Sequence, residues 1–320
     1  METPKAPAVP QDEHIEQPLF NMSNMPNIAQ PKFIEALNFM NAVGNVRNLE
    51  LDLPILLKKV VIRPMEGIDD THLKTLYTSG TQFIRNFNMI IFRNLRNENG
   101  ELMFRTVDEM NSKLTEYDKS MIVFGLLASS FDKLQERASV CPECGEKQIH
   151  EFIPEEMFHP EEMVIWDKRV DPLDYEIKKE LYSDENTKIN ITFKIPTEKD
   201  KIELFSISKI NTRKIEDNKG LVFTTLEYII QYIKSIEFTS KTKNILLTDL
   251  TTEIYPFVAG SNLMMQDKIM KSMPEDEFLK YQPKFYYNVV CKNPNCNHEY
   301  KYNIGNVEDE FFRKTLSLYR

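Results

Sequence analysis

Two stretches of this 320-residue chain decide its fold: Val140-Cys-Pro-Glu-Cys-Gly145 and Val290-Cys-Lys-Asn-Pro-Asn-Cys296. They contain all four cysteines of the sequence. Each cysteine pair lies in a short loop after a β-branched apolar residue, and each loop carries a proline that stiffens it. In the first loop a glycine follows the second cysteine and relieves a tight turn. Two loops that each present two thiolates are typical of a tetrahedral zinc site.

The sequence therefore predicts one structural Zn²⁺ bound by Cys141, Cys144, Cys291 and Cys296. Four thiolates fill the coordination shell, which argues against a catalytic zinc with an open position. His150 and His298 are near enough in sequence to replace a cysteine, but the shell needs no further ligand. Two alternatives stay open at this point. The pairs could be unrelated, or Cys141 and Cys144 could form a redox motif, which would normally open a helix.

The two loops are far apart in the chain, so residues 151–284 are predicted to be an insertion whose ends the metal holds together. The entropic cost of closing such a loop grows only slowly with its length. An apparent zinc-binding free energy of about 10–16 kcal/mol is large enough to offset it.

Residues 51–150 are predicted to be a mainly helical domain that ends in the first cysteine loop. A β-branched run at Lys58–Arg63 indicates a strand that Pro64 ends. Apolar residues then recur at helical spacing after Asp69 or Asp70 as far as about Asn97, where Asn99-Gly100 forms a turn. A short helix is expected at Val107–Leu114. Thr115 and Asp118 resemble a capping box and open a helix to about Gln135.

The centre of that last helix, Met121–Ala128, is apolar on all sides and should be buried. The segment after Cys144, Gly145–His150, has the pattern of a strand leaving a turn.

The insertion is expected to be a mixed α+β region. Residues 153–174 are acidic and irregular. The remaining expected elements are strands at 188–195 and 201–207 around a turn at 196–200, and helices at 221–236, 244–255 and 262–273, the last two separated by Pro256 and Gly260.

The two ends of the chain complete the predicted organisation. Residues 1–50 form an arm rich in proline, either disordered or ordered against a neighbouring subunit, with a short helix at 33–43. Residues 285–320 contain nearly all of a strand from 284 to 290, then the second cysteine loop, a strand at 300–304 and a helix at 309–318. The predicted fold class is thus α+β, a helical amino-terminal region with a zinc-ribbon-like pair of loops closing an α+β insertion.

The composition limits the possible functions. Apolar residues make up 41% and charged residues 28%, as in folded proteins. The net charge of −9 argues against a nucleic-acid partner. Residues 1–17 lack the features of a secretory signal, and the longest apolar run, 121–128, is too short to span a bilayer. These features predict a cytoplasmic protein with reduced thiols and no membrane contact.

No other constellation predicts an enzyme. The sequence has no glycine-rich phosphate loop, no G-x-S-x-G and no H-E-x-x-H, and nothing predicts a small-molecule substrate. Acidic runs such as 155–162 are typical of a solvated face. Trp166 could be an interface anchor or could pack within its own domain. Basic residues near the second loop keep a nucleic-acid-binding alternative open: Lys284, Lys292, Lys301, Arg313 and Lys314.

The order of these motifs resembles a known family. Val61-Ile-Arg-Pro64 precedes the helix opened by Asp69-Asp70, and the Thr115 helix leads to the Cys-Pro-x-Cys-Gly loop. The later cysteine loop is followed by Phe311-Phe-Arg313. Together these resemble the baseplate hub assembly proteins of T-even-like contractile-tailed bacteriophages, over residues 55–150 and 285–315.

This resemblance implies a non-enzymatic structural or assembly protein of the tail baseplate near its hub. It would be made in the host cytoplasm and located in the virion, with other tail and baseplate subunits as partners. The alternative is a zinc-ribbon nucleic-acid-binding regulator, and a thiol redox enzyme is a third, weaker hypothesis.

Overall fold

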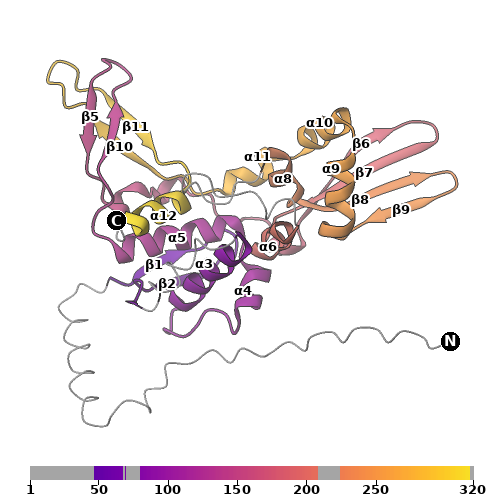
Figure 1. Cartoon of the computed structure of the whole chain (residues 1–320), viewed down its shortest axis with the longest axis horizontal. Coiled ribbons are helices and arrows are strands. Elements are labelled where there is room, and N and C mark those ends of the chain that lie inside the picture. Colours follow the sequence, from indigo (N-terminus) through magenta and orange to yellow (C-terminus); the bar gives the residue numbers. More distant parts are fainter. Residues whose placement is uncertain (1–46, 68, 70–79, 208–223, 318–320) are drawn as a thin grey trace, which may run out of the picture. The chain divides into compact units, whose positions relative to one another are not determined.

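The computed structural model describes residues 47–67, 69, 80–207 and 224–317, which belong to one compact unit, Arg47–Arg320. Helices and strands are mixed along the chain (Figure 1), so the predicted α+β class is confirmed. Residues 1–46, with the predicted helix at 33–43, lie outside the described residues, as do residues 70–79 of the helix expected after Asp69.

The helix predicted to begin after Thr115 is α5 (Glu116–Ser130), which is buried from Tyr117 to Ser129. Thr115 caps it by accepting a hydrogen bond from the N–H of Asp118, as the capping pattern indicated. Phe131 has extended backbone (φ −136°, ψ 129°), so the helix ends five residues before the expected Gln135.

Helix α5 packs against a three-stranded antiparallel sheet of order β1–β2–β3, formed by β1 (Leu49–Asp52), β2 (Lys59–Ile62) and β3 (Leu95–Arg96). Strand β2 confirms the strand expected at 58–63. Two more helices belong to this region, α3 (Gly80–Asn94) and α4 (Val107–Lys113), both expected from the sequence. Gly100 has a φ of +81° in the predicted turn, and its N–H donates to the carbonyl of Asn97.

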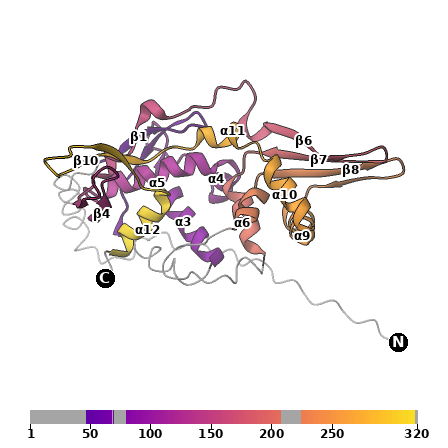
Figure 2. The same ribbon diagram turned by 90° about the horizontal axis from the view of Figure 1, so that it is seen from above.

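A second antiparallel sheet has the order β6–β7–β8–β9 and lies within residues 151–284, the predicted insertion. Its strands are β6 (Glu176–Ser183), β7 (Thr187–Lys194), β8 (Ile233–Ser240) and β9 (Asn244–Leu247). Figure 2 shows helices α9 (Tyr255–Gly260) and α10 (Leu263–Ser272) on one face of this sheet. Phe238 of β8 meets Phe257 of α9 edge to face, with ring centroids 5.1 Å apart. The buried face of the sheet is therefore the one that carries Phe238.

The remaining helical segments in the described part of residues 151–284 are short. They are the 3₁₀ turns η2 (Pro154–Met157), η3 (Pro160–Glu162), η4 (Pro172–Asp174) and η6 (Leu279–Tyr281), the π-helical turn η5 (Leu250–Ile254), and the helices α6 (Glu198–Ser206), α8 (Thr225–Ile230) and α11 (Glu275–Phe278). Residues 153–174 contain no longer element, as expected. Trp166 in this stretch is only 4% exposed and packs against Tyr175 and Tyr281 of the same chain, so it is a core residue.

Two hairpins lie side by side in Figure 1. One is β4–β5, with β4 (Arg137–Val140) and β5 (Lys147–His150). The other is β10–β11, with β10 (Tyr286–Val290) and β11 (Glu299–Asn303). Helix α12 (Val307–Ser317) follows and packs on α5. The strands and the final helix expected around both cysteine loops are thus confirmed.

The prediction of a strand at 201–207 is wrong, because residues 198–206 form helix α6. Asp200 accepts hydrogen bonds from the backbone N–H and the hydroxyl of Thr197, at 2.8 and 3.0 Å. This local cap outweighs the short apolar alternation that suggested a strand. Strand β7 pairs instead with β6 and β8, which the sequence did not indicate.

Two helix predictions fail because the residues pair in the second sheet instead. Residues 221–236 were expected to be one helix, but among residues 224–236, which the structure describes, the helix covers Thr225–Ile230 only, and Ile233 and Ile236 pair with β7. Residues 244–247, expected to open a helix, pair with β8 as β9. Pro256 lies in the first turn of α9 rather than between two helices, a position that tolerates proline.

Within the part of the chain that the structure describes, no helix is both long and apolar enough to cross a membrane.

Candidate metal centre

The first cysteine loop, residues 140–145, is the turn of the β4–β5 hairpin and is called the first knuckle below. The N–H of Cys141 donates to the carbonyl of Glu146, and the N–H of Gly145 donates back to the carbonyl of Cys141, both at 2.9 Å. Gly145 has a φ of +74°, a conformation that glycine adopts without strain. These bonds curl the chain so that both cysteine sulfurs lie on the same side of the turn.

The second knuckle, residues 290–297, repeats this arrangement at the end of β10. The N–H of Cys291 donates to the carbonyl of His298, and the N–H of Cys296 donates to the carbonyl of Asn293, again both at 2.9 Å. Asn297 takes the position of Gly145, with a φ of 49°. Asparagine is the residue that tolerates this conformation best after glycine.

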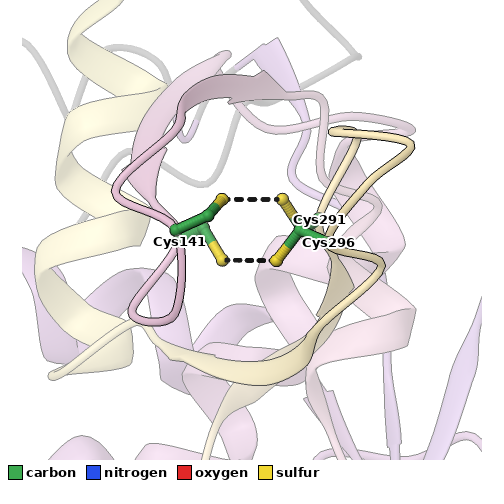
Figure 3. A group of neighbouring side chains, drawn as sticks. Cys141, Cys291 and Cys296 are labelled. Carbon is green, nitrogen blue, oxygen red and sulfur yellow. Dashed lines mark hydrogen bonds between the residues drawn. The ribbon is translucent and has the colours of Figure 1, made fainter.

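The two knuckles bring all four sulfur atoms together, within 4.8 Å of one another. Figure 3 shows the knuckles facing each other across this cluster. The sulfur of Cys141 lies 3.8 Å from that of Cys296, and the sulfur of Cys144 lies 3.6 Å from that of Cys291. All four thiols are free, and a disulfide would need a sulfur separation of about 2 Å.

These distances fit the tetrahedral coordination of one metal ion. Four sulfurs at about 2.3 Å from a central Zn²⁺ are about 3.8 Å apart along each edge of the tetrahedron. Cys141 and Cys291 are buried, Cys296 is half-buried and Cys144 is exposed, so the cluster lies at the edge of the folded unit. The four cysteines could therefore bind one metal ion.

The sulfur atoms perturb one another's ionisation. Burial raises the pKa of Cys141, but hydrogen bonds from the N–H groups of Cys144 and Glu143 outweigh it and lower that pKa to about 7. A hydrogen bond from the N–H of His298 lowers the pKa of Cys296, but burial and the other three sulfurs raise it to about 12. Four thiolates this close repel one another, and a bound cation removes that repulsion.

Polar contacts fix the knuckles relative to each other. The side-chain amide of Gln148, on β5, donates to the sulfur of Cys291 at 2.8 Å. Its oxygen accepts the N–H of Lys292 at 3.0 Å. The hydroxyls of Ser139 and Tyr300 are 2.7 Å apart across the two hairpins. Gln148 thus holds the second knuckle from the first hairpin, a role that no sequence pattern signalled.

Aromatic stacking and an ion pair extend this contact. The ring of Phe152 stacks on that of Tyr287, with centroids 4.0 Å apart. Arg137 of β4 donates to Glu310 of α12 at 2.6 Å. The hairpins therefore form one packed layer, with the sulfur cluster at its end.

The histidines named from the sequence are not in the cluster, whose members in the described residues are the four cysteines alone. His150 stacks on Phe152, and His298 stacks on Tyr300. Both rings pack beside the knuckles. The acidic residues 155–162 form no such group either.

A second polar cluster is buried elsewhere, and sequence reasoning missed it. The ammonium of Lys119 lies 2.7 Å from Glu198 and 3.5 Å from Glu308, and both Lys119 and Glu198 are about 1% exposed. Asn88 also donates to Glu198, at 3.2 Å. These residues come from four separate helices, so no spacing in the sequence links them.

No protein-family model, curated protein or solved structure matches this chain.

Proposed function

We propose that Cys141, Cys144, Cys291 and Cys296 bind one structural Zn²⁺. The observation that supports this is the convergence of four free sulfurs, 3.6 and 3.8 Å apart across the knuckles, in pairs that are 147 and 155 positions apart in the chain. Zinc is the usual occupant of a site with four thiolates. With the shell filled by the protein, the ion has no open position for a substrate or a reactive water.

The role of the ion would be to close the fold. Because the knuckles belong to different hairpins, a metal bound by both joins residues 137–150 to residues 286–303. Contacts of Gln148, Tyr300 and the stacked pair Phe152–Tyr287 also hold the two hairpins together.

The zinc proposal is tested by elemental analysis and thermal unfolding of the purified protein. We expect one zinc per chain, and its removal by a chelator should expose four thiols to titration. Cys141→Ser should lose the metal and lower the midpoint of unfolding, because structural zinc contributes directly to folding free energy. Glu143→Gln, at an exposed side chain in the same knuckle, is the matched control. It should keep the metal and leave the midpoint of unfolding unchanged.

Absence of metal, or a Cys141→Ser protein as stable as the parent, would disprove the site. Reversible oxidation of Cys141 and Cys144 accompanied by turnover would instead favour the redox hypothesis.

We further propose that the chain is a non-enzymatic structural or assembly protein of a contractile phage tail baseplate, near its hub. The support is the order of motifs in the sequence, from the Arg-Pro strand through the Thr115 helix to the two knuckles. A filled metal shell agrees with this role because such an ion positions parts of a protein rather than performing chemistry.

This role is tested by locating the protein. An antibody against the chain should label the baseplate end of purified contractile tails, or detect the chain in their assembly intermediates, from the organism that encodes it. Its absence from both would contradict the proposal, whatever the result for zinc.

The alternative, a zinc-ribbon nucleic-acid binder, predicts salt-sensitive binding of DNA or RNA by the purified protein. Two of the basic residues near the second knuckle already have partners in the chain. Lys301 pairs with Glu162 at 2.9 Å, and the ammonium of Lys292 donates to the carbonyl of Ile149. We therefore expect no such binding.

A further inference from the structure

The two edges of the four-stranded sheet differ in chemistry. Edge strand β6 carries the charged run Lys178-Lys-Glu180, followed by a bulge. Charges and bulges are the devices by which proteins keep an edge strand from pairing with another chain. Edge strand β9, Asn-Ile-Leu-Leu, has no charge, proline or bulge. Ile245 is 39% exposed and Leu246 is 56% exposed.

The register of the β8–β9 hairpin shows which backbone groups of β9 face outward. The N–H of Ser240 donates to the carbonyl of Lys243, so Lys243 faces β8. Backbone groups alternate along a strand, so Ile245 and Leu247 also face β8. The backbone N–H and C=O of Asn244 and Leu246 therefore point away from the sheet. Within the described residues, β9 pairs with β8 only.

The residues that flank β9 carry opposite charges. Lys243 precedes the strand, is exposed, and its ammonium makes no ion pair with any residue that the structure describes. Asp249 follows the strand and is also exposed, and its Oδ1 accepts the N–H groups of Thr251 and Thr252. The N–H of Thr248 donates to Glu253, which leaves the carbonyl of Thr248 as its outward group.

We propose that β9 pairs antiparallel with β9 of a second copy of this chain, about a two-fold axis at Leu246. This register places Leu246 opposite the partner's Leu246, with two backbone hydrogen bonds between them. The N–H of Asn244 meets the carbonyl of the partner's Thr248, and the reciprocal bond makes four in all. The two four-stranded sheets become one continuous sheet.

The side chains select this register over its neighbours. Ile245 comes opposite the partner's Leu247, on the face that carries Phe238 and α9. Lys243 comes opposite the partner's Asp249, so each end of the junction is an ion pair. Pairing centred on Ile245 would instead place Lys243 opposite the partner's Leu247. The strand is thus complementary to itself in both shape and charge, which is what a two-fold interface requires.

The test is the mass of the full-length protein in solution by sedimentation over a wide dilution series. The expected species is a dimer of the 37.6 kDa chain that dissociates on dilution. Leu246→Lys places two like charges opposite each other on the axis and should raise the dissociation constant at least about tenfold. The control is Leu263→Lys, at an apolar residue that is 82% exposed but lies outside the strand, and it should leave the dimer intact.

The register has its own pair of variants. Lys243→Glu puts a carboxylate opposite the partner's Asp249 and should weaken the dimer, while Lys241→Glu, at an exposed residue in the same turn, should not. Unchanged thermal unfolding shows that each variant is folded. A monomer at every concentration, or a dimer indifferent to Leu246→Lys, overturns the proposal. The metal plays no part in this pairing, so failure here leaves the zinc proposal standing.

Discussion

The buried carboxylate of Asp118 joins three residues by accepting their hydrogen bonds. It is fully buried, and a single oxygen, Oδ1, accepts the backbone N–H groups of Ile55 and Leu56, while Oδ2 accepts the hydroxyl of Thr115. Burial raises its pKa from the usual 3.8 to about 6, although these hydrogen bonds oppose the shift. The folded protein therefore binds this proton more tightly than the unfolded chain does.

Stability contributed by Asp118 should consequently fall as the pH rises from about 4 to about 6, by up to about 3 kcal/mol, because one pKa unit corresponds to about 1.4 kcal/mol. Asp118→Asn can still accept from Ile55 and does not titrate. Its free energy of unfolding relative to the parent should rise over that pH range. Chemical denaturation of both proteins at several pH values measures this difference. Any loss of metal at low pH affects both proteins equally and therefore cancels in the difference. A difference that is independent of pH would contradict the expectation.

Residue-level prediction from the sequence succeeded where spacing carries chemistry. The cysteine pairs and the Thr115–Asp118 cap are local patterns. In the structure the two cysteine pairs lie together, and the cap is formed. The contacts of Asp118 with Ile55 and of Gln148 with Cys291 join residues far apart in sequence. No local pattern encodes such contacts, so the sequence did not indicate them.

The contact of helix α5 with the first sheet depends on a residue without a side chain. A Cβ built at Gly125 would lie 2.7 Å from Ile62 and 2.8 Å from Leu51, both in the core. The helix approaches β1 and β2 this closely only because glycine occupies that position.

Gly125→Ala should therefore lower the free energy of unfolding by about 1–3 kcal/mol, since overfilling a packed core forces its neighbours to shift. Gly260→Ala is a matched control in another helix, where an added Cβ meets nothing within 4 Å. That change should be neutral or slightly stabilising, because alanine favours the helix over glycine. Equal destabilisation by both changes, measured by urea denaturation, would show that packing at Gly125 is not the cause.

Elements were predictable where their own residues decide the outcome. The buried helix at 116–130 follows from its apolar run and its cap, and strands β5, β10 and β11 follow from the residue patterns beside the cysteine loops, whereas β4 was not predicted. The helix predictions for residues 233–236 and 244–247 failed because pairing with β7 and β8 overrides a local helical pattern. The strand prediction for residues 201–207 failed for the opposite reason. A helix cap at Thr197 outweighs the apparent alternation of apolar and polar residues.

At the scale of the whole molecule, a buried ion cluster joins three parts of the chain. Lys119 lies in α5, Glu198 in α6 and Glu308 in α12, so one ammonium contacts the insertion and the carboxy-terminal helix together. Burial raises the pKa of Glu308, but the charges of Lys119 and Lys201 outweigh it and hold that pKa below its usual value.

Lys119→Met should destabilise the protein by about 3–5 kcal/mol, because it leaves the carboxylate of Glu198 buried without its counter-charge. Adding Glu198→Gln to that variant removes the uncompensated charge and should recover part of the loss. Lys271→Met breaks an exposed pair with Asp267 and serves as the control, with an expected change below about 0.5 kcal/mol. Denaturant unfolding of the three proteins distinguishes these cases, and a double variant as unstable as the single one would argue against the charge as the cause.

The distance in sequence between the two knuckles has a consequence for synthesis. Translation delivers Cys141 and Cys144 long before Cys291 and Cys296, so the growing chain presents only half of the proposed ligand set until Cys296 has left the ribosome. A chain that stops early can never complete the shell. Capture of the ion would thus report that synthesis of the chain has passed Cys296.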